Sequence, residues 1–281
     1  LKTEIISADS RQVFKHINIG TAKPSSSELG KIKHHFVDCL DLNYDFNVSK
    51  FEEEALTIID KLISQKKIPI IVGGSGLYIK AIIDGIFNNV DVEPEIRNNL
   101  LEERTKYGND HLFEKLRQID PVSAEKLLPQ NWKRVLRALE VFYFTGKPIW
   151  RHQDEYVRNN ENEYYQFGLL WPRSLLYENI NLRVEKMITD GLVKETKEIL
   201  IKNYDRKLNS LNTVGYKEII EYLDGKISLE KTIELIKRNT RHYAKRQMTW
   251  FNKDKRINWM PISSIDELGK ISKIIIEKIK N

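Results

Sequence analysis

The stretch IISADSRQVF, residues 5–14, decides the fold, because it is built like a short buried strand that ends in four polar side chains. In open parallel sheets, ligands bind just beyond the carboxyl ends of the strands. The sequence Asp9-Ser10-Arg11-Gln12 therefore predicts a binding site at that edge of a sheet. A plain helix start is the alternative, since Asp and Ser side chains commonly accept hydrogen bonds from the first backbone N–H groups of a helix.

The composition fits a globular protein with an acidic partner. Hydrophobic residues make up 41% of the 281 positions and charged residues 31%, as in ordinary soluble domains. No apolar run approaches the roughly 20 residues that a membrane-spanning helix needs. The net charge of +6 favours a polyanionic partner. The single cysteine, Cys39, excludes an internal disulfide and is typical of a reducing, cytoplasmic environment.

Strands separated by helices indicate an α/β fold with a parallel sheet. The helix expected over residues 49–67 begins with Ser49 and Glu52 at the spacing of a capping box. A strand, a helix and a second strand in this order form a parallel pair through a right-handed crossover. The expected strands cover residues 3–8, 68–72, 164–171 and 256–260, one strand short of a comfortable doubly wound core.

The pattern changes near residue 91, where charged helical segments replace the alternation of strands and helices. Pro94 and Pro121 are placed to open helices, and the polar stretch at residues 151–163 is expected to be a loop. We therefore divide the chain into a core from 1 to 93, a mainly helical insertion from 94 to 163, and a second core part from 164 to 281.

Three further motifs could carry chemistry. Residues 72–82 run from strand to helix through a glycine-rich turn that would let an anion approach the backbone, although a tight turn without a ligand explains it equally well. Residues 131–148 carry a basic cluster on a helix that otherwise resembles a core helix. Residues 237–256 hold eight Lys or Arg, one acid and interleaved aromatic residues, a pattern shared by RNA-binding segments and solvated helix faces.

Seven motifs, taken in order, resemble the tRNA dimethylallyltransferase (tRNA isopentenyltransferase) family. They lie along nearly the whole chain, which makes the match specific although each motif alone is weak. The seven are SADSRQVF (7–14), NIGTAKP (18–24), HHFVD (34–38), VGGSGLYIKAI (72–82), RALEVFYFTGKP (137–148), VGYKE (214–218) and AKRQMTWF (244–251).

The resemblance implies an enzyme that transfers a dimethylallyl group from dimethylallyl diphosphate to N6 of adenine 37, next to the anticodon of a tRNA. It implies a P-loop NTPase-like parallel core, a helical insertion that grips the anticodon stem-loop, and Mg²⁺ beside the diphosphate. The family's phosphate-binding loop, G-x-x-x-x-G-K-[ST], is absent from this sequence. We expect it in about 20–30 residues, one βα unit, that precede Leu1. We also expect a monomer that does not bind membranes.

By this resemblance, Asp9 engages the adenine N6 amine and accepts its proton as the bond to carbon forms. A role as a Mg²⁺ ligand is the rival assignment for this carboxylate. Ser75 stands where relatives commonly have threonine, so its hydroxyl is expected near the reacting centre. Stabilising the departing diphosphate is the larger task, which Mg²⁺, the absent loop and nearby cations would share. We expect the adenine to leave its stack to reach Asp9, with the diphosphate entering from the opposite side.

The resemblance also assigns residues that contact the tRNA. Lys217 is expected to contact the diphosphate as well, although arginine is frequent at this position and the two are not equivalent at a bidentate site. The assigned tRNA-contacting residues are Asp9, Ser10, Arg11, Gln12, Arg97, Lys133, Arg134, Val135, Leu136, Arg137, Asn212, Thr213, Val214, Gly215, Tyr216 and Lys217.

Three other functions fit parts of the sequence. An isopentenyltransferase acting on free adenine nucleotides would need neither the helical insertion nor the basic segment at 237–256. A P-loop kinase for a small metabolite would not require the aspartate-led tetrad together with basic patches. A catalytically inactive RNA-binding relative would bind tRNA normally without transferring anything to it.

Overall fold

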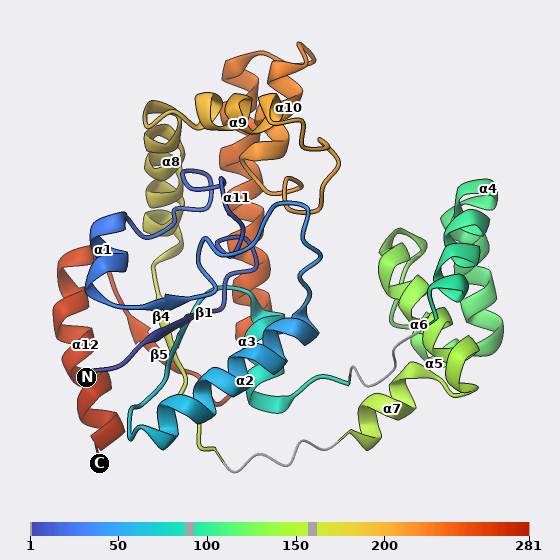
Figure 1. The fold of residues 1–281 in the computed structure, drawn as a ribbon, viewed down its shortest axis with the longest axis horizontal. Helices are drawn as coiled ribbons and strands as arrows, with labels where there is room; N and C mark the ends of the chain where they lie inside the picture. Colours follow the sequence, from blue (N-terminus) through green and yellow to red (C-terminus); the bar gives the residue numbers. More distant parts are fainter. Residues whose placement is uncertain (1, 88–92, 157–161, 281) are drawn as a thin grey trace. The chain divides into compact units, whose positions relative to one another are not determined.

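The computed structural model describes residues 2–87, 93–156 and 162–280 (Figure 1). Its contacts divide the chain into two units, one made of residues 1–82 and 162–281 and the other of residues 83–161. The sequence analysis divides the chain at residues 94 and 163, where the composition changes. The contacts place the first division earlier, within a helix that begins in the first unit.

The first unit is built on two small parallel sheets. In one, β1 (Ile5–Ser7) lies between β2 (His34–His35) and β3 (Ile70–Val72). The other pairs β4 (Phe167–Leu170) with β5 (Asn258–Pro261). The four expected strands are therefore present but shorter than predicted. The sequence analysis missed β2, because a strand of two residues cannot display an alternating pattern.

Helix α2 (Val48–Ser64) crosses over between the paired strands β1 and β3, as the strand spacing predicts. Its N-cap is Asn47, whose Oδ1 accepts hydrogen bonds from Ser49 N at 3.0 Å and Lys50 N at 3.1 Å. The predicted capping box at Ser49 and Glu52 is therefore wrong, because the better acceptor lies two residues earlier. The buried stripe of α2 consists of Phe51, Ala55, Ile59 and Leu62.

Aromatic packing fixes α2 against α3 (Gly76–Asp84), the helix that follows β3. The Phe51 ring is fully buried and stacks on Tyr78, with ring centroids 4.1 Å apart. Phe36 meets the same Phe51 ring edge-on at 5.0 Å. Offset and edge-to-face pairs of this kind add to the stability that burial alone provides. The start of α3, and with it the turn after β3, is therefore anchored to the core.

Four helices from the second half of the chain pack together in this unit (Figure 1). They are α8 (Arg173–Thr189), α9 (Leu192–Ile201), α10 (Tyr216–Leu223) and α11 (Leu229–Phe251). The N-terminal half of α11 buries Thr232 and Ile236, whereas its C-terminal half carries the basic segment and is mostly exposed. The short helix α1 (Ser26–Lys31), the 3₁₀ turn η2 (Ile265–Glu267) and α12 (Leu268–Lys280) complete the unit.

The second unit is helical and has a core of its own. Its elements are α4 (Pro94–Ile119), α5 (Pro121–Ala124), the 3₁₀ turn η1 (Pro129–Asn131), α6 (Trp132–Thr145) and α7 (Ile149–Glu155). Pro94 and Pro121 open helices, as predicted. Gly108 interrupts α4 with a φ of 87°. Leu112 and Leu116 of α4 pack with Leu136 and Leu139 of α6 in a core that is almost wholly closed to solvent.

The loop expected at residues 151–163 begins as helix, since α7 continues to Glu155. Its residues 157–161 lie outside the described residues. None of the helices within the described ranges combines the length and the apolar character needed to cross a membrane.

Replacing Phe51 with alanine should lower the free energy of unfolding by about 3–5 kcal/mol, because the change removes a buried ring and leaves a cavity. Urea denaturation followed by circular dichroism measures this. Ile63, also on α2 but 43% exposed, is the matched control, and Ile63→Ala should change the same quantity by less than about 0.5 kcal/mol. Equal losses in both variants would contradict the assigned core.

Candidate functional site

The turns that follow β1 and β3 are held together by their backbones. Ala8 N donates to Val72 O at 2.7 Å, and Ser75 N donates back to Ala8 O at 3.1 Å. A Cβ on Gly73 would lie 2.2 Å from Ala8 O, so this close approach requires glycine. Ser10 N then donates to the Ser75 hydroxyl at 3.0 Å. The two turns that carry the candidate catalytic side chains therefore form one structure.

Only one of the two carboxylate oxygens of Asp9 takes part in the hydrogen bonds of the turn. Its Oδ1 accepts from Arg11 N at 2.8 Å and from Gln12 N at 3.3 Å. The helix-start interpretation of this motif therefore describes one oxygen, which caps a turn. The other oxygen, Oδ2, makes no hydrogen bond to any residue in the described ranges. A half-buried carboxylate of fixed orientation is thus available to a ligand.

Arg11 folds back toward the protein. Its Nη1 donates to Asn209 O at 2.6 Å. Burial lowers the pKa of Arg11, against the opposing influence of Tyr78, Asp9 and Tyr243. Burial likewise raises the pKa of Tyr78 to about 12. A positive charge is therefore fixed in the neighbourhood of the Asp9 carboxylate by a backbone contact.

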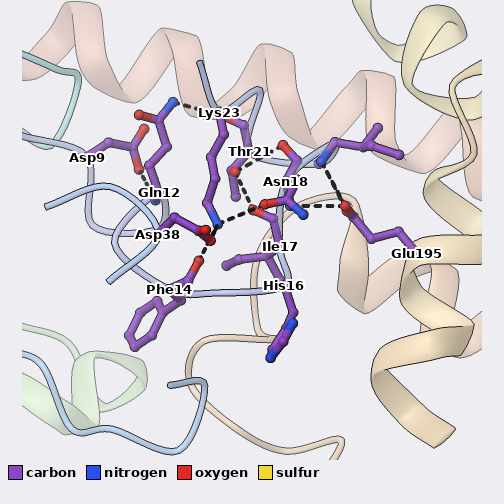
Figure 2. A network of polar contacts seen from close by, with 12 residues as sticks. Asp9, Gln12, Phe14, His16, Ile17, Asn18, Thr21, Lys23, Asp38 and Glu195 are labelled. Atoms are coloured by element: carbon purple, nitrogen blue, oxygen red, sulfur yellow. Dashed lines mark hydrogen bonds and ion pairs between the residues drawn. The ribbon is translucent and has the colours of Figure 1, made fainter. Parts of the chain in front are cut away.

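The Gln12 side chain also makes its hydrogen bonds within the protein. Its Nε2 donates to Thr21 O and to Ala22 O, both at 3.1 Å, and its Oε1 accepts from Ser7 Oγ at 3.3 Å. Both amide protons are therefore used. The side chain ties the loop of residues 16–23 to the turn after β1 (Figure 2).

Lys23 supports the same loop from within. Its ammonium group donates to Asn18 Oδ1 at 3.0 Å, to Asp38 Oδ1 at 2.6 Å and to Phe14 O (Figure 2). Only 5% of its side chain is exposed. With its three donors occupied, this lysine stabilises the loop and is not placed to bind a phosphate.

Glu195 of α9 joins this loop to α10, and the sequence analysis did not identify it. Its carboxylate accepts from Asn18 N and Ile19 N at 3.1 Å and from the Tyr216 hydroxyl at 2.5 Å. The same hydroxyl accepts from Gly20 N at 3.0 Å. Burial, followed by the Glu195 charge, raises the pKa of Tyr216, so its proton stays in place. Glu195 lies in an ordinary amphipathic helix, where no local motif marks it.

Helix α11 covers the glycine turn after β3. Gln247 Nε2 donates to Gly74 O at 2.9 Å, and a Cβ on Gly76 would lie 2.4 Å from the Trp250 ring. Tyr243 lies one turn earlier on α11, and burial followed by the Asp9 charge raises the pKa of Tyr243. These three α11 residues share one face by their spacing. The sequence analysis left this segment between RNA binding and a solvated helix face, and did not place it against the glycine turn.

The remaining predicted residues occupy different environments. In the first unit, Lys217 is half exposed with its Nζ 3.6 Å from Glu218 Oε1, whereas Tyr216 is fully buried. In the helical unit, Lys133 and Arg134 are exposed on α6. The side chains of Val135 and Leu136 are buried in the helical core at 0% and 1% exposure, so any contact of these two residues with tRNA would have to come from their backbone.

Six of the seven motifs thus meet in the first unit through the contacts described above. The residues around Asp9 join the glycine turn through Ser75, the loop of residues 16–23 through Gln12, and HHFVD through a hydrogen bond from Asp38 N to Gln12 O at 2.8 Å. The motif VGYKE joins the cluster through the hydrogen bond from Gly20 N to the Tyr216 hydroxyl, and AKRQMTWF joins it through the hydrogen bond from Gln247 to Gly74 O. The arrangement presents a carboxylate oxygen, a fixed cation and a glycine turn before a helix, which together suit an amine and an anionic group.

The chain matches known proteins along nearly its full length. A family model described as IPP transferase matches residues 12–254. The chain is 43% identical over 272 residues to the tRNA dimethylallyltransferase of Acetivibrio thermocellus, an alignment that covers 96% of this chain and 87% of that protein. It is 44% identical to the tRNA dimethylallyltransferase of Lachnoclostridium phytofermentans, with 98% and 90% covered.

Two solved structures resemble the fold. The full-length tRNA isopentenylpyrophosphate transferase from Bacillus halodurans has a TM-score of 0.69 and 35% identity, covering 100% of this chain and 89% of that one. A eukaryotic dimethylallyltransferase studied acting on tRNA has a TM-score of 0.77 and 27% identity, covering 94% of this chain and 69% of the other.

Replacing Tyr216 with phenylalanine should lower the free energy of unfolding by about 1–3 kcal/mol, because Gly20 N loses its acceptor and Glu195 loses its donor in a partly buried place. Urea denaturation measures this loss. Tyr44→Phe serves as the control, since Tyr44 is 46% exposed and its loss should stay below about 0.5 kcal/mol. A Tyr216→Phe protein as stable as the parent would show that the hydroxyl does not hold the loop.

Proposed function

Because the chain belongs to the IPP transferase family, we propose that the dimethylallyl group that it transfers to tRNA is attached to N6 of adenine 37, beside the anticodon. Transfer of a dimethylallyl group to tRNA is the activity of the relatives that align with almost the whole chain. The exact acceptor atom rests on the seven motifs. The core is proposed to be P-loop NTPase-like, which the all-parallel order β2-β1-β3 supports.

Asp9 is the proposed group that orients the amine. An adenine amine is a poor nucleophile because its lone pair is delocalised into the ring, so it gains from a carboxylate that accepts its proton as the new bond forms. The unengaged Oδ2 of Asp9 supports this role, because the other oxygen is fixed by Arg11 N and Gln12 N. The Ser75 hydroxyl, which accepts from Ser10 N, lies on the adjoining turn.

Mg²⁺ is the proposed cofactor, and the described residues offer it one carboxylate, that of Asp9. Across the described ranges, no three His, Cys, Asp or Glu side chains cluster so as to hold a metal. Mg²⁺ in phosphate chemistry commonly takes only one or two carboxylates together with phosphate oxygens and water. The Asp9 carboxylate would be that protein ligand under the rival assignment. When bound, Mg²⁺ would neutralise charge on the departing diphosphate.

The helical unit is the proposed RNA grip. Its exposed cations Arg97, Lys133 and Arg134 are available to phosphates, whose neutralisation supplies much of the affinity for nucleic acid. An adenine stacked in a loop has to be extruded to meet a carboxylate set at the end of a strand. Polar groups of the first unit would then read the extruded base while cations hold the backbone.

Asp9→Asn should lower the rate of transfer about 100-fold or more, because the amide cannot take a proton, while leaving tRNA affinity nearly unchanged. The assay incubates the full-length gene product with dimethylallyl diphosphate, Mg²⁺ and unmodified tRNA and then measures the mass of the adenosine. Raising Mg²⁺ should not rescue the variant, whereas rescue would favour the metal-ligand role. Asp60→Asn, on the exposed side of α2, is the control. Transfer to free AMP but not to tRNA would overturn the proposal.

Lys217→Ala should raise the KM for dimethylallyl diphosphate about tenfold. The reason is that the loss of one charge-assisted contact weakens the binding of an anion by roughly 1.5 kcal/mol or more. Lys217→Arg should match or improve on the parent, since a guanidinium binds a diphosphate bidentately. Steady-state kinetics at saturating tRNA separates the two effects. A change confined to the KM for tRNA would reassign Lys217 to the RNA.

A further inference from the structure

A carboxylate is buried in the helical unit between two arginines. Glu140 of α6 is 1% exposed, and its Oε1 accepts from Arg97 Nη1 at 2.8 Å. Its Oε2 lies 3.7 Å from Nη1 of Arg137, one helical turn earlier on α6. Arg97 belongs to α4, so the carboxylate joins the two longest helices of this unit.

The two arginines extend from this carboxylate toward solvent. The side chain of Arg97 is 57% exposed and that of Arg137 is 31% exposed, although both reach the buried Glu140. Burial raises the pKa of Glu140, and the two guanidinium groups act in the opposite direction. Burying an ionised carboxylate without a positively charged partner is strongly unfavourable, so Glu140 depends on the two arginines. Together, the two guanidinium groups and the carboxylate carry a net positive charge.

Such an arrangement is costly if its only purpose is stability, because apolar residues of similar volume often stabilise a core at least as well. A guanidinium held at one edge keeps its remaining N–H donors in a fixed plane. Fixing that plane in advance removes the rotamer entropy that a long side chain otherwise loses on binding. The hydrogen bond to Glu140 therefore suits the Arg97 guanidinium to meeting a phosphate in a defined orientation, with the charge of Arg137 close by.

We propose that Glu140 is a positioning residue for tRNA binding, which holds the guanidinium group of Arg97 in the orientation that engages the RNA. This inference rests on the proposed function of the helical unit. The change that it predicts in tRNA affinity when the Glu140 charge is removed is opposite to the change expected from net charge alone. Loss of a negative charge should strengthen attraction to RNA at long range, whereas loss of a positioning contact should weaken specific binding.

Equilibrium tRNA binding without dimethylallyl diphosphate, by filter retention across a range of salt concentrations, tests this directly. Glu140→Gln should raise the dissociation constant about tenfold, the loss expected when an arginine contact to RNA is weakened. In transfer assays the KM for tRNA should rise similarly, while kcat and the KM for dimethylallyl diphosphate stay within about twofold. A merely structural role would lower the melting temperature without this selective change.

A double-mutant cycle identifies the route of the effect. Arg97→Ala alone should weaken binding, and adding Glu140→Gln to it should cost less than Glu140→Gln costs alone, because the two act through one contact. Glu103→Gln is the control, since Glu103 pairs with His111 and Lys115 in the same unit. If Glu140→Gln does not fold, Glu140→Asp withdraws the carboxylate by one methylene and should weaken tRNA binding in the same way.

Unchanged or tighter tRNA binding by the folded Glu140 variants, or fully additive effects with Arg97→Ala, would overturn the inference. Failure of the proposed function looks different, since the parent protein would then bind or modify no tRNA at all. In that case the measured dissociation constants of parent and variants would be equally weak.

Discussion

The close approach of two backbones at the ends of β1 and β3 is the constraint on which the site depends. Gly73 passes so near Ala8 that a Cβ would lie 2.2 Å from its carbonyl oxygen, and the strands exchange hydrogen bonds on either side of this point. The turns carrying Asp9 and Ser75 are thereby forced together. Because the contact is between main chains, side-chain motion cannot loosen it. Helix α11 contacts this junction through Gln247, and α2 packs on the following helix α3 through Phe51 and Tyr78.

Some polar side chains next to this junction have structural roles and others are available to a ligand, and the sequence alone does not distinguish the two groups. Gln12 and Lys23 resemble ligand-binding groups, yet both spend their donors on backbone carbonyls and side chains within 15 residues along the chain. Asp9 and Lys217 differ from them, since the hydrogen bonds of the turn engage only Oδ1 of Asp9 and the Lys217 side chain is 44% exposed. Side chains whose hydrogen bonds are all made within the protein, such as Gln12 and Lys23, thus support the few side chains that can still bind a ligand. Preorganised sites are built in this way.

The sequence predicts the parallel pair β1–β3 and the helix between them because hydrophobic periodicity and turn residues are local signals. The family resemblance, and not a local pattern, predicts that Ser75 lies near the reacting centre with Asp9. The sequence does not reveal β2, Glu195 or the contact of Gln247 with Gly74, which depend on residues far apart along the chain. The resemblance also does not distinguish, within residues 133–137, the exposed Lys133 and Arg134 from Val135 and Leu136, whose side chains belong to the helical core.

The two separate cores bear on how the chain opens under native conditions. The core around Phe51 and Tyr216 and the core around Leu112 and Leu139 share no buried residue within the described ranges. Cooperative units of this kind can open independently, each with its own free energy. Amide hydrogens of α4 and α6 could therefore exchange with solvent while the hydrogen bonds between β1 and β3 stay protected. The chain can in this way sample a loosened helical unit without losing the preorganised turn at Asp9.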